Sequence, residues 1–578
     1  MQASVLRFRS RHSGSALLMT MVLTGVALAT LAGIMSWAVT SAKQTDRANQ
    51  YARATASAEA VVEKVLSQLC QDYLSGGEAL VQVNLSQYQQ TVLTSADSPY
   101  WGDWQFSDAQ GNPGQTYIQG SPSTNYVVLN STYAGLQGFA SMYTIVSDAC
   151  ETAALQNVTA GVYQQIELAR IPIFQFAMFS SDDMEISCGQ PFVITGRVHS
   201  DGNLYVEPDN ALTFQSDVTA VGDILFQREP LDTRGTPAGS VVYQGQQISH
   251  VPVLTLPIGV SNTPTAIQQI IEPPPPLESP TSSMGRLRYY NLVDMVLTVS
   301  DSRIIGTSGL FNGFSTVVPA AQLQNFVNTS NSFYDAREAK TVRPIDINIT
   351  NFVAWSATNT SLRLALHSRD VSSLYVYDLR TPSPTTLGAV RLINGQRLPS
   401  LGLTVATALP IYVQGHFNQP NAANVGTSNT STTLPASLVG DAVTILSTQW
   451  SDANSTAPLS SRVAGCTTVN AAILAGEVET TAGHYSGGME NFPRFLESWG
   501  LANVFTYNGS MVKMFPSAYA TNFWGLTNVY NPPARNWAFD VNFNTPSKLP
   551  PLTPSLQKVL RCQWATVAPN QTVAPANN

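Results

Sequence analysis

The stretch SGSALLMTMVLTGVALATLAGIMSWAVTSA, residues 13–42, decides how the chain is organised. It contains no charged residue, whereas Arg7, Arg9 and Arg11 precede it and Lys43 follows it. At a rise of 1.5 Å per residue, a helix of this length covers about 45 Å, which exceeds the roughly 30 Å hydrocarbon core of a bilayer. The stretch is therefore predicted to form a helix that spans a membrane.

A cleaved secretory signal and a retained anchor are the two interpretations of this stretch. A secretory signal has an apolar core of about 7–15 residues, and the apolar run 17–39 is longer. The small residues of 36–42 would still offer a signal peptidase a cleavage site. The length of the apolar run favours the retained anchor over the cleaved signal. The basic flank would then stay in the cytoplasm and the rest of the chain would cross the membrane.

The predicted helix continues beyond the apolar run as an amphipathic helix. Apolar residues recur there at intervals of three and four, which is the spacing of one helix face. They are Tyr51, Ala54, Ala58, Val61, Val62, Val65 and Leu69. The pair Gly76-Gly77 is a helix-ending signal. We expect one helix over 15–76, with a membrane half first and a water-exposed half second.

The N-terminus resembles a type IV prepilin signal, and within that group the PilX-type minor pilins and the K-type pseudopilins of type II secretion. The resemblance rests on a short basic leader, 1–14, that ends in Gly14 and is followed by Ser15-Ala-Leu-Leu-Met. It implies that a prepilin peptidase cuts after Gly14 and methylates Ser15. Major pilins carry Glu at the fifth mature position, where this chain has Met19; the minor proteins often lack that Glu.

The resemblance also implies that the membrane helix packs against the helices of other pilin-like proteins. Small residues let helix backbones approach closely within a bilayer. The small-residue surface expected to mediate this contact consists of Ala27, Ala29, Ala32, Gly33 and Ser36.

The remainder of the chain is predicted to be mainly β. Short apolar strands alternate with Gly, Asn and Asp turns, most clearly in 192–226. Units of this size cannot bury their own faces, so they would stack as a β-solenoid, or β-helix; a β-sandwich explains the same pattern. The body further resembles a large family of uncharacterised bacterial envelope proteins. The residues that carry this resemblance include Gly196-Arg-Val-His-Ser-Asp-Gly-Asn-Leu-Tyr and Gly402-Leu-Thr-Val-Ala-Thr.

Composition changes along the chain suggest the domain boundaries. Prolines 273–276 favour an extended linker, and the pattern-poor end favours disorder. Residues 492–499 are a candidate short helix. The expected segments are a leader (1–14), the long helix (15–76), a small β-rich domain (77–180), a solenoid-like module (181–228), a Pro-rich linker (229–285), a second β-rich domain (286–564) and a disordered tail (565–578).

Composition argues against two function classes. Charged residues are only 11% of the 578 residues, against roughly 25% in typical soluble domains, so the body suits a secreted or cell-surface protein. The net charge of −8 and the lack of a basic run argue against nucleic-acid binding. The five cysteines form no CxxC pair, so zinc-ligand spacing is absent.

Several clusters could carry chemistry, each with a simpler structural explanation. Gly483-His484-Tyr485-Ser486 resembles a serine-nucleophile loop but also reads as a glycine-rich turn. The acidic residues of 182–185 could bind Ca²⁺ or act as a carboxylate pair. The acidic residues of 335–338 could do the same. Hydrogen bonds within turns and a local ion pair are the simpler explanation of both groups. No nucleotide-binding motif occurs. We expect no catalytic residue, cofactor or metal ligand.

The sequence therefore predicts a non-enzymatic, membrane-anchored structural component of a type IV pilus-like or type II secretion-like assembly. It would sit in the bacterial inner membrane, with its N-terminus in the cytoplasm and its body periplasmic or extracellular. Its partners would be the membrane and other pilin-like proteins, with no nucleic acid. The alternatives are a membrane-tethered carbohydrate-active β-helix enzyme and a surface adhesin or glycan-binding protein.

Overall fold

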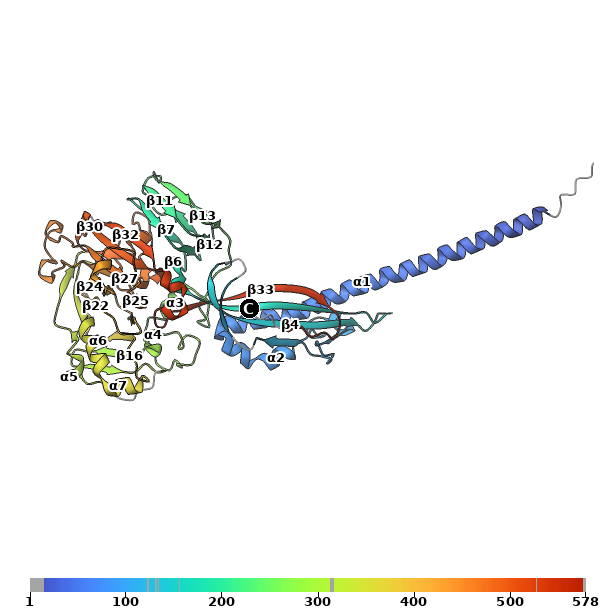
Figure 1. The fold of residues 1–578 in the computed structure, drawn as a ribbon, viewed down its shortest axis with the longest axis horizontal. Coiled ribbons are helices and arrows are strands. Elements are labelled where there is room, and N and C mark those ends of the chain that lie inside the picture. Colours follow the sequence, from blue (N-terminus) through green and yellow to red (C-terminus); the bar gives the residue numbers. More distant parts are fainter. Residues whose placement is uncertain are drawn as a thin grey trace, which may run out of the picture.

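The chain forms a long helix, a sheet domain beside the second half of that helix, and a large β-rich body (Figure 1). We call the sheet domain, residues 50–172 and 555–574, the head, and residues 173–554 the body. The prediction of mainly β structure behind a long N-terminal helix is confirmed. The computed structural model describes residues 15–121, 124–129, 133, 135–154, 156–311, 317–525 and 528–574.

The helices of the described residues are one long helix and several short ones. They are α1 (Ser15–Val83), α2 (Leu85–Gln89), α3 (Pro264–Gln268), α4 (Tyr289–Leu292), α5 (Ala320–Leu323), α6 (Ile349–Thr358) and α7 (Thr360–Ala365). The long helix α1 breaks where the sequence predicted, because Gly77 has a φ of 68°. Helical geometry then resumes, so α1 ends seven residues later than the expected end at 76, at Val83.

The head is an antiparallel sheet that packs against the second half of α1. Its strands are β1 (Trp104–Ser107), β2 (Tyr117–Gly120), β3 (Asn125–Val128), β4 (Gln137–Glu151), β5 (Thr159–Pro172) and β33 (Ser555–Val567). The order is β1-β4-β5-β33, with β2 and β3 also paired to β4. Strand β33 lies near the end of the chain, and it pairs with β5 from Ser555 opposite Pro172 to Val567 opposite Gly161. The body is therefore an insertion between two neighbouring strands of the head.

The first strands of the body fold into stacked coils. These strands are β6 (Phe176–Ser180), β7 (Met184–Ile186), β8 (Phe192–Ile194), β9 (Arg197–Ser200), β10 (Leu204–Val206), β11 (Ala211–Phe214), β12 (Val218–Ala220), β13 (Ile224–Leu225), β14 (Ser240–Tyr243) and β15 (Gln247–Ile248). Parallel pairing places Met184, Leu204 and Ile224 in one register, a spacing of 20 residues. Of the two arrangements expected for the body, stacked parallel strands match the solenoid-like one.

The later strands of the body continue the same stack. They are β16 (Met295–Val299), β17 (Ile304–Thr307), β18 (Val327–Asn328), β19 (Phe333–Asp335), β20 (Lys340–Asn348), β21 (Ser373–Asp378), β22 (Thr386–Gly395), β23 (Leu403–Ala406), β24 (Ile411–Phe417), β25 (Ala436–Gly440), β26 (Val443–Leu446), β27 (Thr467–Asn470), β28 (Ala472–Glu477), β29 (Pro493–Phe495), β30 (Ser498–Gly509), β31 (Met511–Pro516) and β32 (Asn531–Phe539). One sheet runs β15-β12-β9-β6-β31-β28-β25-β23-β21-β16-β17, and a second runs β18-β20-β22-β24-β27-β30-β32.

The path of the chain through the body is not sequential. After β6, the chain adds β9, β12 and β15 in turn on one side of β6. It then crosses to β16 near the other end of the sheet and adds strands back toward β6, until β31 pairs with β6. Both ends of the insertion therefore lie at the middle of the sheet, beside the head. The interior between the sheets is filled by buried apolar side chains such as Val198, Leu374 and Ile473.

The segment 229–285 is not a free linker. Although it contains prolines 273–276, it forms β14, β15 and α3. Its apolar residues, among them Leu254, Ile267 and Ile271, are buried in a cluster with Tyr375 and Leu474 of β21 and β28. The composition predicted a linker, but apolar residues between the prolines hold the segment against the sheet.

The remaining boundaries also differ from the expected ones. Residues 286–564 do not form a separate domain, because β31 and β6 join the two expected modules in one sheet, and β33 belongs to the head. The short helix predicted over 492–499 is wrong: strands β29 and β30 occupy it. The tail expected to be disordered from 565 begins inside β33, and Val573 packs beside Val146 and Tyr163 of the head.

Candidate membrane anchor

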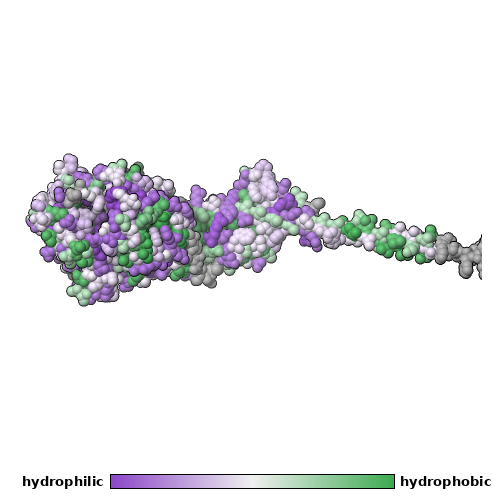
Figure 2. Space-filling model, turned by 90° about the horizontal axis from the view of Figure 1, so that it is seen from above, coloured by the Kyte–Doolittle hydropathy of each residue, from purple (hydrophilic) through white to green (hydrophobic). Residues whose placement is uncertain are grey.

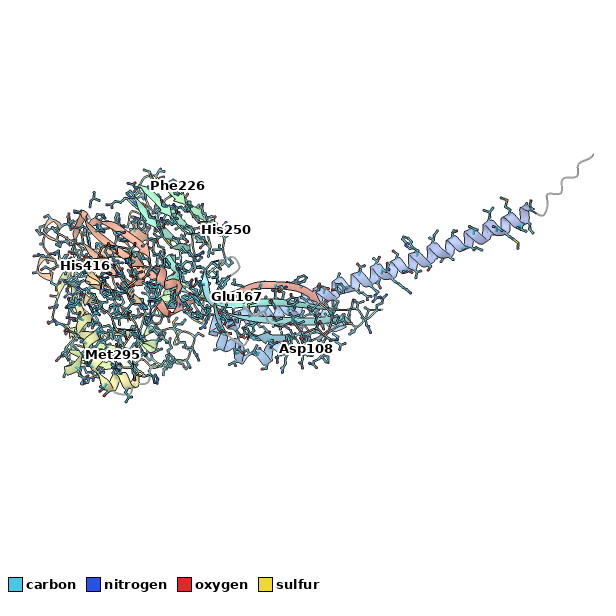
Figure 3. The ribbon with its side chains drawn as sticks, viewed as in Figure 1. Asp108, Glu167, Phe226, His250, Met295 and His416 are labelled. Atoms are coloured by element: carbon cyan, nitrogen blue, oxygen red, sulfur yellow. The ribbon has the colours of Figure 1, made fainter. Side chains whose placement is uncertain are left out.

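The outer segment of α1, residues 15–42, projects away from the rest of the molecule as a bare helix. Its side chains touch no other element in Figure 3, and Figure 2 shows an apolar surface along it. Leu23 is 61% exposed and Trp37 is 72% exposed. The most apolar 18-residue window of α1 has a mean hydropathy of 2.1 and contains no buried residue. Since water solvates such a surface poorly, the segment has the length and composition to cross a membrane.

The threonine hydroxyl groups in the outer segment are satisfied within the helix itself. The Oγ1 atoms of Thr20, Thr24, Thr30 and Thr40 donate to the carbonyl oxygens four residues earlier, at 3.0, 2.5, 3.0 and 2.8 Å. A hydroxyl that lacks a partner is costly in hydrocarbon. These bonds remove that cost, so the threonines do not oppose insertion.

The inner segment of α1, residues 50–76, has one buried face. Gln50 is the first buried residue of the helix. Val61, Val65 and Leu69 have no exposed surface and pack with Ile145 and Ile166 of the head sheet. Fully burying a side chain of this size stabilises the fold by roughly 1.5–3 kcal/mol. The predicted amphipathic stripe therefore fixes the head to the helix from Ala54 onward, but Tyr51, which it was expected to include, is 42% exposed.

Ion pairs flank this buried face. Arg53 pairs with Glu151 at 2.9 Å, and Lys64 pairs with Asp97 at 2.7 Å. The guanidinium of Arg561 on β33 donates to both carboxylate oxygens of Glu63, at 2.6 and 2.7 Å. All three pairs are at least partly exposed, so they contribute less than the apolar face.

The structure tests the geometry of the predicted processing and packing residues. Gly14 and the leader 1–14 lie outside the described residues, and Ser15 is the first residue of α1. At about 100° per residue, Ala29, Ala32, Gly33 and Ser36 share one face of the helix. Ala27 lies on nearly the opposite side, so it does not belong to that surface.

One residue of this face was missed by the sequence analysis. Gly25 stands four residues before Ala29, as Gly33 stands four residues after it. A Cβ atom built on Gly25 or Gly33 would meet nothing within 4 Å. We call Gly25, Ala29, Ala32, Gly33 and Ser36 the small-residue face. The repeated spacing of four would have identified Gly25 from the sequence.

The acidic residues of 182–185 have separate partners. Asp182 pairs with Lys513 at 2.7 Å, and the Asp183 carboxylate accepts the backbone N–H of Asn203 at 2.6 Å. The Glu185 carboxylate accepts the Thr480 hydroxyl at 2.7 Å. Burial raises the pKa of Glu185 to about 7. Across the described residues no group of three or more His, Cys, Asp or Glu side chains is arranged to hold a metal ion.

The cluster around Asp335 is likewise engaged in structural contacts. One carboxylate oxygen of Asp335 accepts the backbone N–H groups of Arg337 and Glu338 at 2.7 and 2.9 Å. The other accepts the Tyr412 hydroxyl at 2.6 Å. Glu338 pairs with Arg494 at 3.1 Å. These bonds connect a turn to the neighbouring coils.

The residues of the serine-nucleophile-like loop point to different partners. The exposed His484 ring stacks on Phe523 with centroids 4.0 Å apart. Ser486 is buried, and its Oγ accepts the backbone N–H of Gly488 at 3.0 Å. The arrangement is that of a packed glycine-rich turn.

No protein-family model matches this chain, and no curated protein matches it. Among solved structures, the crystal structure of the competence-associated pilin ComZ from Thermus thermophilus is similar over 86% of this chain and 97% of that chain, with 11% sequence identity and a TM-score of 0.28.

Proposed function

We propose that this protein is a membrane-anchored structural component of a type IV pilus-like or type II secretion-like envelope assembly, with a role that requires no catalysis. The observation that carries the proposal is the division of α1 into a bare apolar outer segment and an inner segment whose stripe packs against an antiparallel sheet. A single continuous helix thus links a bilayer to a folded head.

The orientation of the protein follows from the charges around the outer segment. Arg7, Arg9 and Arg11 precede it, and basic flanks stay on the cytoplasmic side. The head and body would then lie outside the cytoplasm. Figure 1 places the body at the opposite end of the head from the outer segment, which suits its presentation away from the membrane.

The helix would join the assembly through the small-residue face. Gly25, Ala29 and Gly33 repeat at intervals of four residues, the spacing that allows close helix contact in lipid. The finer assignment to PilX-type minor pilins or K-type pseudopilins rests on the leader ending in Gly14 and on Met19 in place of Glu.

The mature N-terminus tests the proposal. Intact-mass and terminal peptide measurements on membrane-extracted protein should show a chain that begins at N-methylated Ser15, and Gly14→Arg should retain the leader. Ser10→Arg, which adds the same charge away from the cleavage position, is the control and should be processed normally. A chain cut within 36–42, or a full-length chain in the soluble cytosol, would refute the anchor.

A further inference from the structure

A pocket of about 340 Å³ lies in the body, where the beginnings of β20 and β22 meet the loop after β21 and the segment after β31. Its size lies within the range of small-molecule sites. Three basic side chains, Lys340, Arg343 and Arg380, line it, and Asp378 is the acidic residue among its lining. Three cations in one pocket are unusual in a chain with a net charge of −8.

Asp378 neutralises one of these charges, that of Arg380, and leaves the other two. Its carboxylate is held by Arg380, whose Nε and Nη2 donate to it at 2.9 and 2.7 Å. Arg380 is 8% exposed, and its Nη1 is buried without a hydrogen-bond partner among the described residues. A buried donor without a partner costs about 1–3 kcal/mol, and the two N–H groups that Arg380 directs at Asp378 are already occupied.

The two remaining cations keep donors for a ligand. The closest carboxylate to Arg343 is that of Asp301, at 3.8 Å, and Asp301 accepts the backbone N–H and hydroxyl of Thr381 at 2.9 and 2.6 Å. Lys340 has no ion pair with any residue that the structure describes. Arg343 Nη1 also donates to the Thr381 carbonyl oxygen at 3.4 Å, which leaves further N–H donors on its guanidinium. The pocket therefore has two cations, Lys340 and Arg343, available for an anion.

The rest of the lining suits a polyhydroxylated molecule. Hydroxyl groups of Thr381, Ser383, Thr386 and Thr521 surround the basic residues. Tyr519, also in the lining, is 38% exposed. Hydroxyl groups exchange hydrogen bonds with sugar hydroxyls, and an exposed aromatic ring offers a flat apolar surface to the C–H face of a sugar ring.

We propose that this pocket binds a sugar acid, a monosaccharide unit that carries a carboxylate. The carboxylate is held by Lys340 and Arg343, because an ammonium and a guanidinium both form charge-assisted hydrogen bonds with a carboxylate. The sugar hydroxyls contact the threonine and serine side chains, and Tyr519 lies against the ring. This binding is independent of the proposed membrane role, since the pocket is built entirely from the body.

The test measures binding to the detergent-solubilised full chain by calorimetry at low salt, with D-galacturonate, D-glucuronate, D-galactose and inorganic phosphate as separate probes. At least one of the two sugar acids should bind at millimolar concentration or below, and galactose at least about tenfold more weakly, because it lacks the charge. Lys340→Gln and Arg343→Gln should each weaken binding of that sugar acid by about tenfold, and Tyr519→Ala should weaken it less. Arg397→Gln, which removes an equal charge at an exposed site outside the pocket, should leave it unchanged.

Every other outcome overturns the proposal. Equal binding of galactose and the sugar acids would remove the role of the carboxylate. Binding of phosphate with no sugar acid would mean that the pocket is a simple anion site. Sugar-acid binding unaffected by the variants would place the ligand elsewhere, and no binding of either sugar acid would leave the pocket without this ligand. Unchanged thermal midpoints of the variants exclude misfolding as the cause of any loss.

Discussion

The two segments of α1 are built from similar apolar residues but meet different surroundings. The outer segment is apolar on all sides and touches nothing, whereas the inner segment is apolar on one side and packs against the head. The difference lies in the placement of charge: none occurs over 13–42, while Arg53, Glu63 and Lys64 surround the inner stripe. The placement of charged residues, more than the apolar content, indicates that the outer segment suits a bilayer and that the inner segment suits a boundary between the head and water.

The largest expected effect comes from charging the outer segment. Leu23→Asp combined with Leu31→Asp should oppose insertion by roughly 5–7 kcal/mol, since each acid costs about 3 kcal/mol at the centre of a membrane helix. The variant should move from the membrane fraction to the soluble fraction in flotation experiments. Its head should unfold at the same denaturant concentration as the unmodified chain. Ala48→Asp, outside the apolar run, is the matched control and should remain in the membrane.

The next effect tests the inner segment. Leu69 is fully buried, so Leu69→Ala should lower the free energy of unfolding of the head by about 2–5 kcal/mol. Chemical denaturation in detergent, followed by tryptophan fluorescence, measures this loss. Leu74→Ala on the same helix removes the same atoms from a side chain that is 42% exposed and should cost much less. Equal losses would mean that the stripe does not hold the head.

The stability of the head and the membrane binding of the outer segment should depend differently on pH. Burial raises the pKa of Glu167 on β5 above its ordinary value, and one of its carboxylate oxygens is buried without a hydrogen-bond partner among the described residues. A raised pKa stabilises the fold below the ordinary value of about 4.5, and this stabilisation is lost as pH rises through the raised pKa. The head should therefore lose stability between pH 4.5 and neutral pH. Membrane binding, which depends on the charge-free segment, should stay constant over the same range.

Replacing this carboxyl checks the cause of that dependence. Glu167→Gln should raise the free energy of unfolding at neutral pH by about 1 kcal/mol and reduce its variation with pH. Glu59→Gln, at a partly exposed position of α1, is the control. If Glu167→Gln left the pH profile of the head unchanged, another group would be responsible.

The smallest effect concerns the ion pair between the inner segment and β33. Its side chains are 58% and 42% exposed, so Arg561→Gln should cost less than about 1 kcal/mol. A double-mutant cycle with Glu63→Gln measures the coupling, which should fall further at high salt. A coupling above about 2 kcal/mol would show that charge, and not the apolar stripe, determines the attachment.

Local features of the fold could be predicted from the sequence. The charge-free run and the stripe from Tyr51 to Leu69 each repeat within a few residues, so both segments of α1 were recognisable. The alternation of short strands and turns in 192–226 was visible for the same reason, whereas the 20-residue spacing came only from the strand register in the structure. The predicted small-residue surface included Ala27 and omitted Gly25, because the type of residue alone does not give its angle around the helix; whether the face packs against other helices stays a prediction.

Long-range features could not be predicted. Nothing near Ser555 shows that it pairs with Pro172, because strand pairing depends on complementary surfaces that periodicity does not describe. The same limit hid the joining of β31 to β6 and the buried position of Ile267 and Ile271. The candidate pocket escaped notice because only the fold brings Lys340 and Arg343 of β20 beside Arg380, which follows β21.

The register of β5 and β33 has a consequence for how the protein is built. Pro172 and Ser555 are direct antiparallel partners, so two residues would suffice to join them as a hairpin. In thermodynamic terms the entire body occupies the position of one turn. The entropic cost of closing a loop grows only slowly with its length. The same head can therefore accept an inserted segment of very different length, or none, without a change in the pairing of β5 and β33.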